Sequence, residues 1–518
     1  MALLNSKIMI CKNIKLDEKY VNVLNYNEEQ MLNLCNNNRV AYSDSYSFIK
    51  DDESILVNFS YSDCLQSNYI AFQNPNYSNK WFFGFIDEVT YKGDSCTEIK
   101  FKIDSWATWY GNWNVSDCFV VREHVNNDTV GIHTVPEDFE TGEYITQATN
   151  KIEVFDEFIP CMAVTELPPG DLATGPEVSL TFQMYNGIFS GFAYLVSDTI
   201  QHFSNLIVNY NDGGKGSAIK NIFMIPKVFA NNLTYSTFSK SGELSVFAII
   251  PGNNSANAID YQGFDKPTTL GSYTPRNKKL LTYPYCYMCF DNGCGNAVEI
   301  RYEDYNTNKC GYTVEYALCA GGSVKFSPIN YRGVSINRLY SVIGGKFPNC
   351  AWSSDEYVNW LTQNSINHKA TAVSGIMKLF SPKSFLSGIS DIISLAGAYE
   401  QHDTVPPTVD GNLNGGDINF VLGLYNPIIY QNCIKPEYAK IIDEMFDRRG
   451  YKVNLTKKPN ITGRKYWNYI QVGPKESIAF GNVPKKFIEE INTIAQNGTT
   501  IWHDHANIGN FSLNNTII

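Results

Sequence analysis

The sequence predicts a mainly β, multi-domain protein with an α+β portion near its C-terminal end. The chain has 518 residues, too many for one hydrophobic core, and 43% of them are hydrophobic, so several packed domains are expected. Apolar and polar residues alternate in several stretches of the first two-thirds, as they do in strands with one solvated face. Apolar residues at helical spacing are clearest in the last hundred residues.

Two hairpins give the clearest β signals. In residues 81–104, Ile99, Phe101 and Ile103 alternate with charged residues after a turn at 92–95. In residues 311–328, alternate apolar positions share a face and the sequence Ala-Gly-Gly-Ser supplies the turn. Further strands are expected within residues 178–185, 244–250, 297–305 and 466–472.

Two amphipathic helices are expected in the C-terminal portion. The first lies between Pro436 and Gly450, and the second ends before Gly498. Packed against strands, they make a compact α+β unit. Their predicted apolar stripes are Tyr438, Ile441, Ile442, Met445 and Phe446 in the first helix and Phe487, Ile488, Ile491, Ile494 and Ala495 in the second.

We predict four parts along the chain, separated by stretches rich in Pro and Gly. Residues 167–176 and 405–417 have the composition of irregular connections. The predicted parts are a β-rich domain (1–170), one or two middle β-rich domains (171–365), an apolar segment with its linker (366–416) and an α+β domain (417–518).

Charge and cysteine content limit the function classes. The formal net charge of −11 argues against a nucleic-acid binder with a broad basic face, but not against a protein past which DNA slides. The N-terminal residues lack the pattern of a secretory signal, so synthesis is expected to end in a cytoplasm. In that reducing compartment, the 13 cysteines are expected to be buried free thiols rather than a disulfide framework.

The sequence nominates no metal site and no cofactor. Cys286 and Cys289 have a zinc-like spacing, but on a strand an offset of three places them on opposite faces. His503 and His505 would share one face of a strand, yet a solvated strand end or loop is the simpler interpretation.

No catalytic residue is predicted either. The common nucleophile, phosphate-binding and metalloprotease motifs are missing, and carboxylates such as Glu137 and Asp138 show no sign of a tuned acid/base pair. The distance between two carboxyl groups, which decides a glycosidase-like site, cannot be read from a sequence. A cell-wall-degrading enzyme and a receptor-binding module in residues 171–365 therefore remain alternatives to a structural protein.

The most unusual stretch is Ser374–Gln401, in which the only charged residues are Lys378, Lys383 and Asp391 and, near its end, Glu400. From Ser384 to Tyr399 one stripe of a helix is apolar, but 16 residues span roughly 24 Å, short of the roughly 30 Å hydrocarbon core of a bilayer. A buried helix under a loop and a segment that changes its surroundings are both open interpretations. The stripe consists of Phe385, Leu386, Ile389, Ile392, Ile393 and Ala396.

Several specific strings resemble the tail tube/knob protein of small short-tailed phages of the Picovirinae type, which infect Gram-positive bacteria. The resemblance runs from about residue 8 to residue 511. The strings that carry it are KNIKLDEKYVNVL (12–24), the run from SNYIAFQNPNYSNKWFFGF to DSWATW (67–109), FVVREHV (119–125), LLTYPYC (280–286), KKPNITGRKYWNYIQV (457–472) and GNVPKKFIEEINTIAQNGTTIWH (481–503).

The resemblance implies a non-enzymatic structural protein of the virion, at the distal end of the tail. Its expected partners are five further copies in a homohexamer, the upper tail or collar proteins, and phage DNA that passes through the lumen without sequence-specific binding. Tube domains of this family pair sheet edges between subunits. The hairpin of residues 81–104 is similar to such a tube-forming element.

The resemblance also implies a long hydrophobic loop at about residues 366–416. Such a loop plugs the closed tail tip and then penetrates the host cell membrane for genome ejection, and several copies can line a pore that one short helix cannot. No cofactor is implied. The expected membrane-inserting residues are Ile376, Met377, Leu379, Phe380, Phe385, Leu386, Ile389, Ile392, Ile393 and Leu395.

Overall fold

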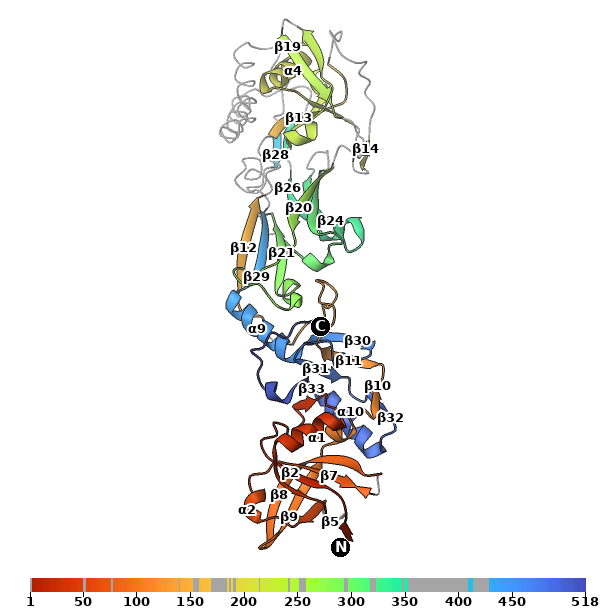
Figure 1. Cartoon of the computed structure of the whole chain (residues 1–518). Helices are drawn as coiled ribbons and strands as arrows, with labels where there is room; N and C mark the ends of the chain where they lie inside the picture. Colours follow the sequence, from red (N-terminus) through yellow and green to blue (C-terminus); the bar gives the residue numbers. More distant parts are fainter. Residues whose placement is uncertain are drawn as a thin grey trace. The chain divides into compact units, whose positions relative to one another are not determined.

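The structure of the chain is a computed structural model. Figure 1 draws its helices and strands along the sequence. The described residues are 2–49, 53–75, 78–138, 140–151, 158–168, 184–185, 188–189, 192–213, 215–240, 243–250, 258–292, 297–316, 323–346, 349–352, 409–412 and 428–518.

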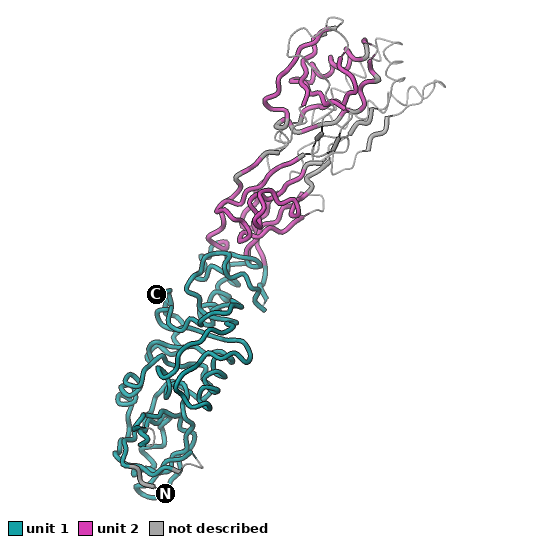
Figure 2. Tube along the Cα trace, turned by 90° about the vertical axis from the view of Figure 1, so that its right-hand side faces the viewer, with its two compact units in different colours: residues 1–143, 272–285, 434–518 teal, residues 144–271, 286–433 magenta. Residues whose placement is uncertain are grey.

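The chain forms two compact units, each assembled from separated stretches (Figure 2). Unit 1 consists of residues 1–143, 272–285 and 434–518, and unit 2 of residues 144–271 and 286–433. The chain therefore returns to unit 1 twice after leaving it. The short middle stretch of unit 1, residues 272–285, must be held by contacts with the two longer ones.

An eight-stranded antiparallel sheet occupies the N-terminal part of unit 1. Its predicted hairpin is confirmed, because Ile99 lies opposite Val89 and Phe101 opposite Ile86. Phe72 stacks on Phe82 with 5.7 Å between ring centroids, and it meets Phe101 edge-on at 5.2 Å. In spatial order the strands are β1 (Ala2–Leu4), β5 (Tyr46–Ile49), β6 (Ser54–Val57), β9 (Cys96–Ile103), β8 (Lys80–Gly93), β7 (Tyr69–Asn74), β2 (Ile8–Cys11) and β4 (Arg39–Ser43).

A second sheet in unit 1 joins the two ends of the sequence. β3 pairs in parallel with β33, and the sheet also holds the predicted strand at 466–472 as β31. Trp467 and Trp502 pack at 5.0 Å between ring centroids in its core. The strand order is β3 (Asn22–Leu24), β33 (Thr499–Trp502), β31 (Trp467–Val472), β11 (Cys118–Glu123) and β30 (Tyr451–Lys457), and a separate ribbon pairs β10 (Trp113–Val115) with β32 (Ala479–Gly481).

Both predicted C-terminal helices form, as α9 (Pro436–Arg449) and α10 (Lys485–Asn497). In α10 the predicted residues Ile491, Ile494 and Ala495 are buried. In α9 the stripe is rotated from the prediction, because Ile441 and Met445 are exposed. The buried face of α9 is instead Ala439, Ile442, Asp443 and Phe446.

The described part of unit 1 also holds three shorter α-helices, and each begins with a side-chain cap. α1 begins with a capping box, in which the Asn27 side chain accepts from the Gln30 amide at 2.9 Å and the Gln30 side chain accepts from the Asn27 amide at 3.0 Å. No helix is predicted at this position from the apolar pattern. The three are α1 (Glu28–Asn37), α2 (Tyr61–Cys64) and α3 (Ser105–Trp109).

Within its described residues, unit 2 contains three larger sheets, a small two-stranded pair and one long helix, α4 (Ile200–Asp212). This helix is not among those predicted from the sequence. The mainly β fold class is confirmed. In spatial order, the first sheet is β12 (Tyr144–Lys151), β29 (Ile428–Ile434), β21 (Cys286–Asp291) and β22 (Ala297–Ile300). The second is β18 (Ser236–Lys240), β19 (Glu243–Ile249), β16 (Ala193–Val196), β13 (Phe158–Val164), β17 (Ile219–Pro226), β27 (Asn349–Trp352) and β28 (Val409–Asn412). The third is β20 (Ala258–Asp265), β23 (Lys309–Tyr316), β24 (Ser323–Tyr331) and β25 (Val334–Ile336), with β26 (Val342–Lys346) also paired to β24, and the small pair is β14 (Met184–Tyr185) with β15 (Ile188–Phe189).

The second predicted hairpin is present as the β23 and β24 pair, in which Val314 lies opposite Phe326. The predicted irregular connection at 405–417 is wrong over four residues. Val409–Asn412 form β28, because their backbone groups pair with β27. The predicted strand at 178–185 lies mostly outside the described residues.

Gly450 ends α9 in a conformation that only glycine adopts easily, with φ +57° and ψ −157°. A Cβ here would lie 2.1 Å from the Glu123 carbonyl oxygen. We predict that Gly450→Ala lowers the free energy of unfolding of unit 1 by about 3 kcal/mol or more. Gly111→Ala is the matched control, because φ is +85° but no atom lies within 4 Å of its Cβ, and it should cost only about 1 kcal/mol. Equal losses in thermal or denaturant unfolding would contradict the clash.

Candidate functional site

All ten predicted membrane-inserting residues, Ile376 to Leu395, lie outside the described residues, as does most of the predicted loop at 366–416. They stay a prediction. Within the part of the chain that is described, no helix is long and apolar enough to cross a membrane.

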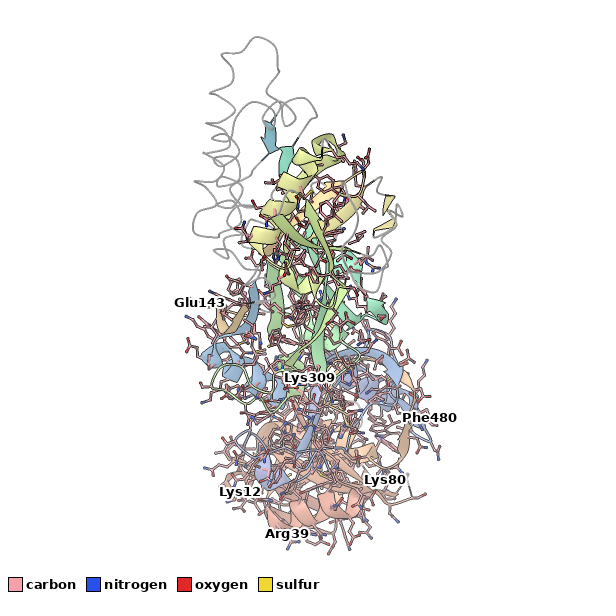
Figure 3. All side chains as sticks on the ribbon, turned by 90° about the horizontal axis from the view of Figure 1, so that it is seen from above. Lys12, Arg39, Lys80, Glu143, Lys309 and Phe480 are labelled. Carbon is pink, nitrogen blue, oxygen red and sulfur yellow. The ribbon has the colours of Figure 1, made fainter. Side chains whose placement is uncertain are left out.

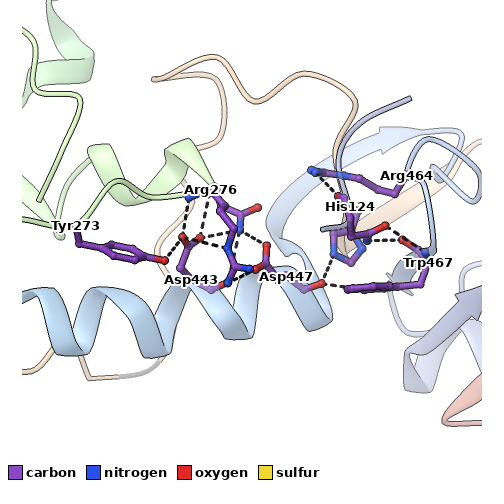
Figure 4. A network of polar contacts seen from close by, with 9 residues as sticks. His124, Tyr273, Arg276, Asp443, Asp447, Arg464 and Trp467 are labelled. Atoms are coloured by element: carbon purple, nitrogen blue, oxygen red, sulfur yellow. Dashed lines mark hydrogen bonds and ion pairs between the residues drawn. The ribbon is translucent and has the colours of Figure 1, made fainter. Parts of the chain in front are cut away.

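The described residues contain a dense group of buried polar side chains around α9 in unit 1, drawn in part in Figure 4. We call the contacts of Asp443, Asp447, His124, Glu137 and Lys279 the anchor network. It joins three stretches that are far apart in the sequence, namely the region after β11, the short stretch 272–285, and the C-terminal portion.

Asp443 lies at the centre of the network, on the buried face of α9, with a fully buried side chain. Its Oδ2 atom accepts hydrogen bonds from the Tyr273 hydroxyl at 2.8 Å and from the Arg276 amide at 2.7 Å. Its Oδ1 atom accepts from the amide of Asn277 at 3.1 Å and from its Nδ2 at 2.7 Å. Four donors from residues 273–277 therefore replace the water that this carboxylate loses on burial.

Asp447 extends the network by one turn of α9. Its carboxylate accepts from Asn277 Nδ2 at 2.8 Å and pairs with Arg276 at 2.5 Å. Burial raises the pKa of this carboxyl group, against the opposing effects of Asn277 and Arg276. The backbone oxygen of Asp447 also accepts from Trp467 Nε1 at 2.9 Å, so α9 is tied to β31 as well.

His124 is buried beyond the end of β11 and uses both ring nitrogens. Nδ1 accepts from the Tyr469 amide at 2.7 Å, so Nε2 carries the proton and donates to the Asp447 backbone oxygen at 2.9 Å. Burial, with the nearby positive charge of Arg464, lowers the pKa of His124 to about 3. The imidazole is therefore neutral at physiological pH and has no free nitrogen for proton transfer.

A buried ion pair holds the middle of the 272–285 stretch. Lys279 Nζ lies 2.7 Å from Glu137 Oε1, and both side chains are almost fully buried. Glu137 also pairs with Arg122 and accepts from the Lys452 amide at 2.9 Å. Burial lowers the pKa of Lys279, and the Glu137 carboxylate opposes this effect. Removing one partner would leave an uncompensated buried charge.

An open cavity of about 700 Å³ lies beside the network, between α9 and residues 509–512. Arg276, Lys440 and Arg448 bring positive charge to its wall, and Glu444 and Asp447 bring negative charge. Its walls thus carry charges of both signs. The described carboxylates of the anchor network have donors matched to them, which is the arrangement of a structural anchor rather than of a poised acid/base pair.

This network is not predicted from the sequence. Glu137 has no feature that distinguishes it from other acidic residues, and Asp443 lies among the apolar residues of the predicted stripe of α9. The detectable signal was the position of Asp443 next to Ile442 on the face that the helix buries. An acidic residue on a buried helix face needs donors from elsewhere in the fold.

The candidate metal residues of the sequence do not come together. Cys286 is buried and Cys289 is half-buried on alternating faces of β21, as predicted for a strand. His505 Nε2 accepts from the Lys15 amide at 3.0 Å, in the region after β33. Among the described residues, no group of three or more His, Cys, Asp or Glu side chains could hold a metal ion.

The lowered pKa of His124 predicts a specific pH dependence. Between about pH 6.5 and 3 the unfolded state binds one more proton at this residue than the folded state, so its contribution to stability falls as the pH falls. Gln can offer similar donor and acceptor groups without titrating. The excess stability of the unsubstituted chain over His124→Gln should therefore shrink by about 1.4 kcal/mol per pH unit between about pH 6 and 4.

Hydrogen exchange of α9 amides, measured on both proteins in parallel, gives this difference. Burial raises the pKa of Asp104 to about 6, so its contribution to stability changes with pH in the opposite direction. Because both proteins contain Asp104, this contribution cancels in the difference. A stability difference that is constant with pH would contradict a neutral, buried His124.

Comparisons with known proteins agree with this fold. A family model described as the C-terminal domain of the tail knob protein gp9 of Bacillus phage phi29 matches residues 245–516, and one described as the N-terminus of the caudoviral major tail protein matches residues 4–114. The tail knob protein gp9 of phage phi29 is 25% identical, with 91% of each chain covered. That of phage PZA is 26% identical, with 87% of this chain and 88% of the relative covered.

Among solved structures, the bacteriophage C1 tail knob protein gp12 has a TM-score of 0.65 at 16% identity, covering 99% of this chain and all of that one. This likeness supports the fold. The first family model covers more than half of the chain. The chain belongs to the tail knob protein family of short-tailed phages, and it is a structural component of the virion tail. The resemblance noted from the sequence is thereby confirmed.

Proposed function

We propose that six copies of this chain form a ring at the distal end of the tail, and that the ring conducts the phage genome. Family membership supports a tail position. The eight-stranded sheet lies within the stretch matched to major tail proteins, and each of its terminal strands, β1 and β4, pairs on one side within the described part of the chain. Edge strands of this kind favour sheet pairing between subunits.

The charge of the chain suits a conduit better than a DNA-binding protein. A net charge of −11 per chain repels phosphates on average, so DNA passes without sequence-specific binding. We propose that the ring attaches to upper tail or collar proteins of the virion. We assign it no catalytic role, in keeping with relatives that are named as tail knob proteins.

We further propose that residues 366–416 plug the lumen and then penetrate the host membrane. The observation that carries this step is the composition of Ser374–Gln401, which is mostly apolar with four charged residues in an acidic, polar chain. Such a segment would promote aggregation unless it were hidden before infection. The copies of a ring offset the short length of each amphipathic stripe.

The ring can be tested by measuring the mass of the purified protein in solution. We expect a particle of six times the mass of one chain, with a central channel in electron micrographs. A stable monomer at high concentration would contradict the ring. Specific adsorption of a fragment from residues 171–365 to host cells would instead favour a receptor-binding role.

A further inference from the structure

Two buried thiols lie directly opposite each other in unit 2. In the antiparallel pair of β21 and β29, Cys286 is the register partner of Cys433, and neither side chain is exposed to solvent. Both are free thiols in the structure. Register partners on neighbouring strands point their side chains to the same face of the sheet.

The backbone hydrogen bonds next to Cys286 and Cys433 indicate whether these residues form a hydrogen-bonded or a non-hydrogen-bonded pair. The next pair along is Tyr285 and Ile434, and the Ile434 amide donates to the Tyr285 oxygen at 3.0 Å. Hydrogen-bonded and non-hydrogen-bonded pairs alternate in antiparallel sheets, so Cys286 and Cys433 form a non-hydrogen-bonded pair with Cα atoms about 4.5 Å apart. Disulfides span Cα separations of about 4.4 to 6.8 Å. The backbone is therefore already placed for a bond.

We propose that Cys286 and Cys433 are a modification site, at which a cross-strand disulfide closes after the virion leaves the reducing cytoplasm. The two thiols lose two protons and two electrons, and a sulfur–sulfur bond forms between them. A low-molecular-weight disulfide accepts both electrons and both protons and becomes two thiols. In the free form the Cys433 thiol donates to Gln147 Oε1 at 3.4 Å, so closure requires rotation of this side chain.

The consequence concerns the stretch between the two strands. A bond from Cys286 to Cys433 encloses residues 287–432, which include the segment 366–416 of the proposed function. The two ends of residues 287–432 would then be joined covalently, whether or not the segment 366–416 moves during infection. Burial raises the pKa of both thiols, so thiolate is scarce and closure is slow at neutral pH.

Two neighbouring cysteines provide matched controls. Cys289 is on the same strand but on the other face and half-buried. Cys310 is buried and near enough to affect the pKa of Cys286, so it is the natural competitor for a bond. The proposal requires that neither takes part.

The test is to incubate the purified full-length chain with oxidised glutathione at about pH 8, alongside a sample in dithiothreitol. Free thiols are then blocked with N-ethylmaleimide under denaturing conditions, and unreduced peptides are identified by mass spectrometry. We expect a linked peptide that joins Cys286 to Cys433, and a band that migrates faster in unreduced gels because the chain carries a closed loop. Both should disappear on reduction.

Cys433→Ala should abolish the faster band, whereas Cys289→Ala and Cys310→Ala should retain it. The proposal fails if both thiols are still alkylated after oxidation, or if Cys286 is found linked to Cys310. If Cys433→Ala does not fold, the presence or absence of the linked peptide in the unsubstituted chain still tests the proposal. If oxidised rings form normally but contain no bond between Cys286 and Cys433, the disulfide is overturned and the proposed function stays intact.

Discussion

A chain that lacks residues 375–400 should form rings but release no dye from liposomes, whereas the full-length protein should release it. The deletion removes the apolar stripe that the proposed function assigns to the membrane. Leakage measured across pH 4 to 8 covers the range in which a trigger by protonation would act. The expected effect is a complete loss of leakage.

A single added charge tests membrane insertion of the stripe without deleting the whole segment. Ile392→Asp places a carboxylate within the predicted stripe, where it costs about 2.5 to 3.5 kcal/mol at the centre of a membrane helix, and leakage should fall more than tenfold. Ser394→Asp adds the same charge on the opposite side of the predicted helix and should leave leakage nearly unchanged. Equal effects of the two substitutions, or leakage by the deleted chain, would contradict a membrane-inserting stripe.

Asp443→Asn should loosen the hold of unit 1 on residues 272–285. Each carboxylate oxygen accepts from two donors, and of these only the Tyr273 hydroxyl can also accept. An amide nitrogen in either place therefore leaves at least one buried N–H donor without its acceptor. We expect a loss of about 3 kcal/mol, since hydrogen bonds to a charged group contribute about 1.5 to 3 kcal/mol each. Trypsin should then cut near Lys278 on the order of 100-fold faster under native conditions, if cleavage follows local opening.

The matched control is Asp138→Asn. Its carboxylate pairs with Lys452 but is 86% exposed, so its loss should have little effect on stability and leave the cleavage rate near that of the unsubstituted chain. If Asp443→Asn were cut no faster than Asp138→Asn, the anchor network would not be what holds the stretch.

Local patterns in the sequence predict a helix or strand correctly where one of its faces is buried and the other is exposed to solvent. The β8 and β9 hairpin follows alternation, and α10 follows its apolar stripe, because burial of one face decides both. α9 shows the limit of this reasoning. Its apolar residues extend around more than one face, and the donors for Asp443, which come from residues 273–277, select the face that is buried.

The anchor network depends on contacts that a linear reading cannot supply. His124, Asn277 and Asp447 lie in three separate stretches of the chain. The sequence of one stretch does not indicate which residues of the other two it contacts. α1 could have been predicted from its capping box, since Asn27 and Gln30 have the required spacing. The exposed Phe480, which Figure 3 labels, has no such signal, because short strands such as β32 carry too little pattern to assign a face.

The most direct test of the central claim is to locate residues 366–416 by electron cryo-microscopy, in purified rings alone and in rings bound to liposomes. We expect density for the segment inside the lumen of free rings, and in the bilayer with an open channel after binding. Free rings with an empty lumen, and the segment packed on their outer surface both before and after liposomes are added, would contradict a plug that becomes a membrane channel.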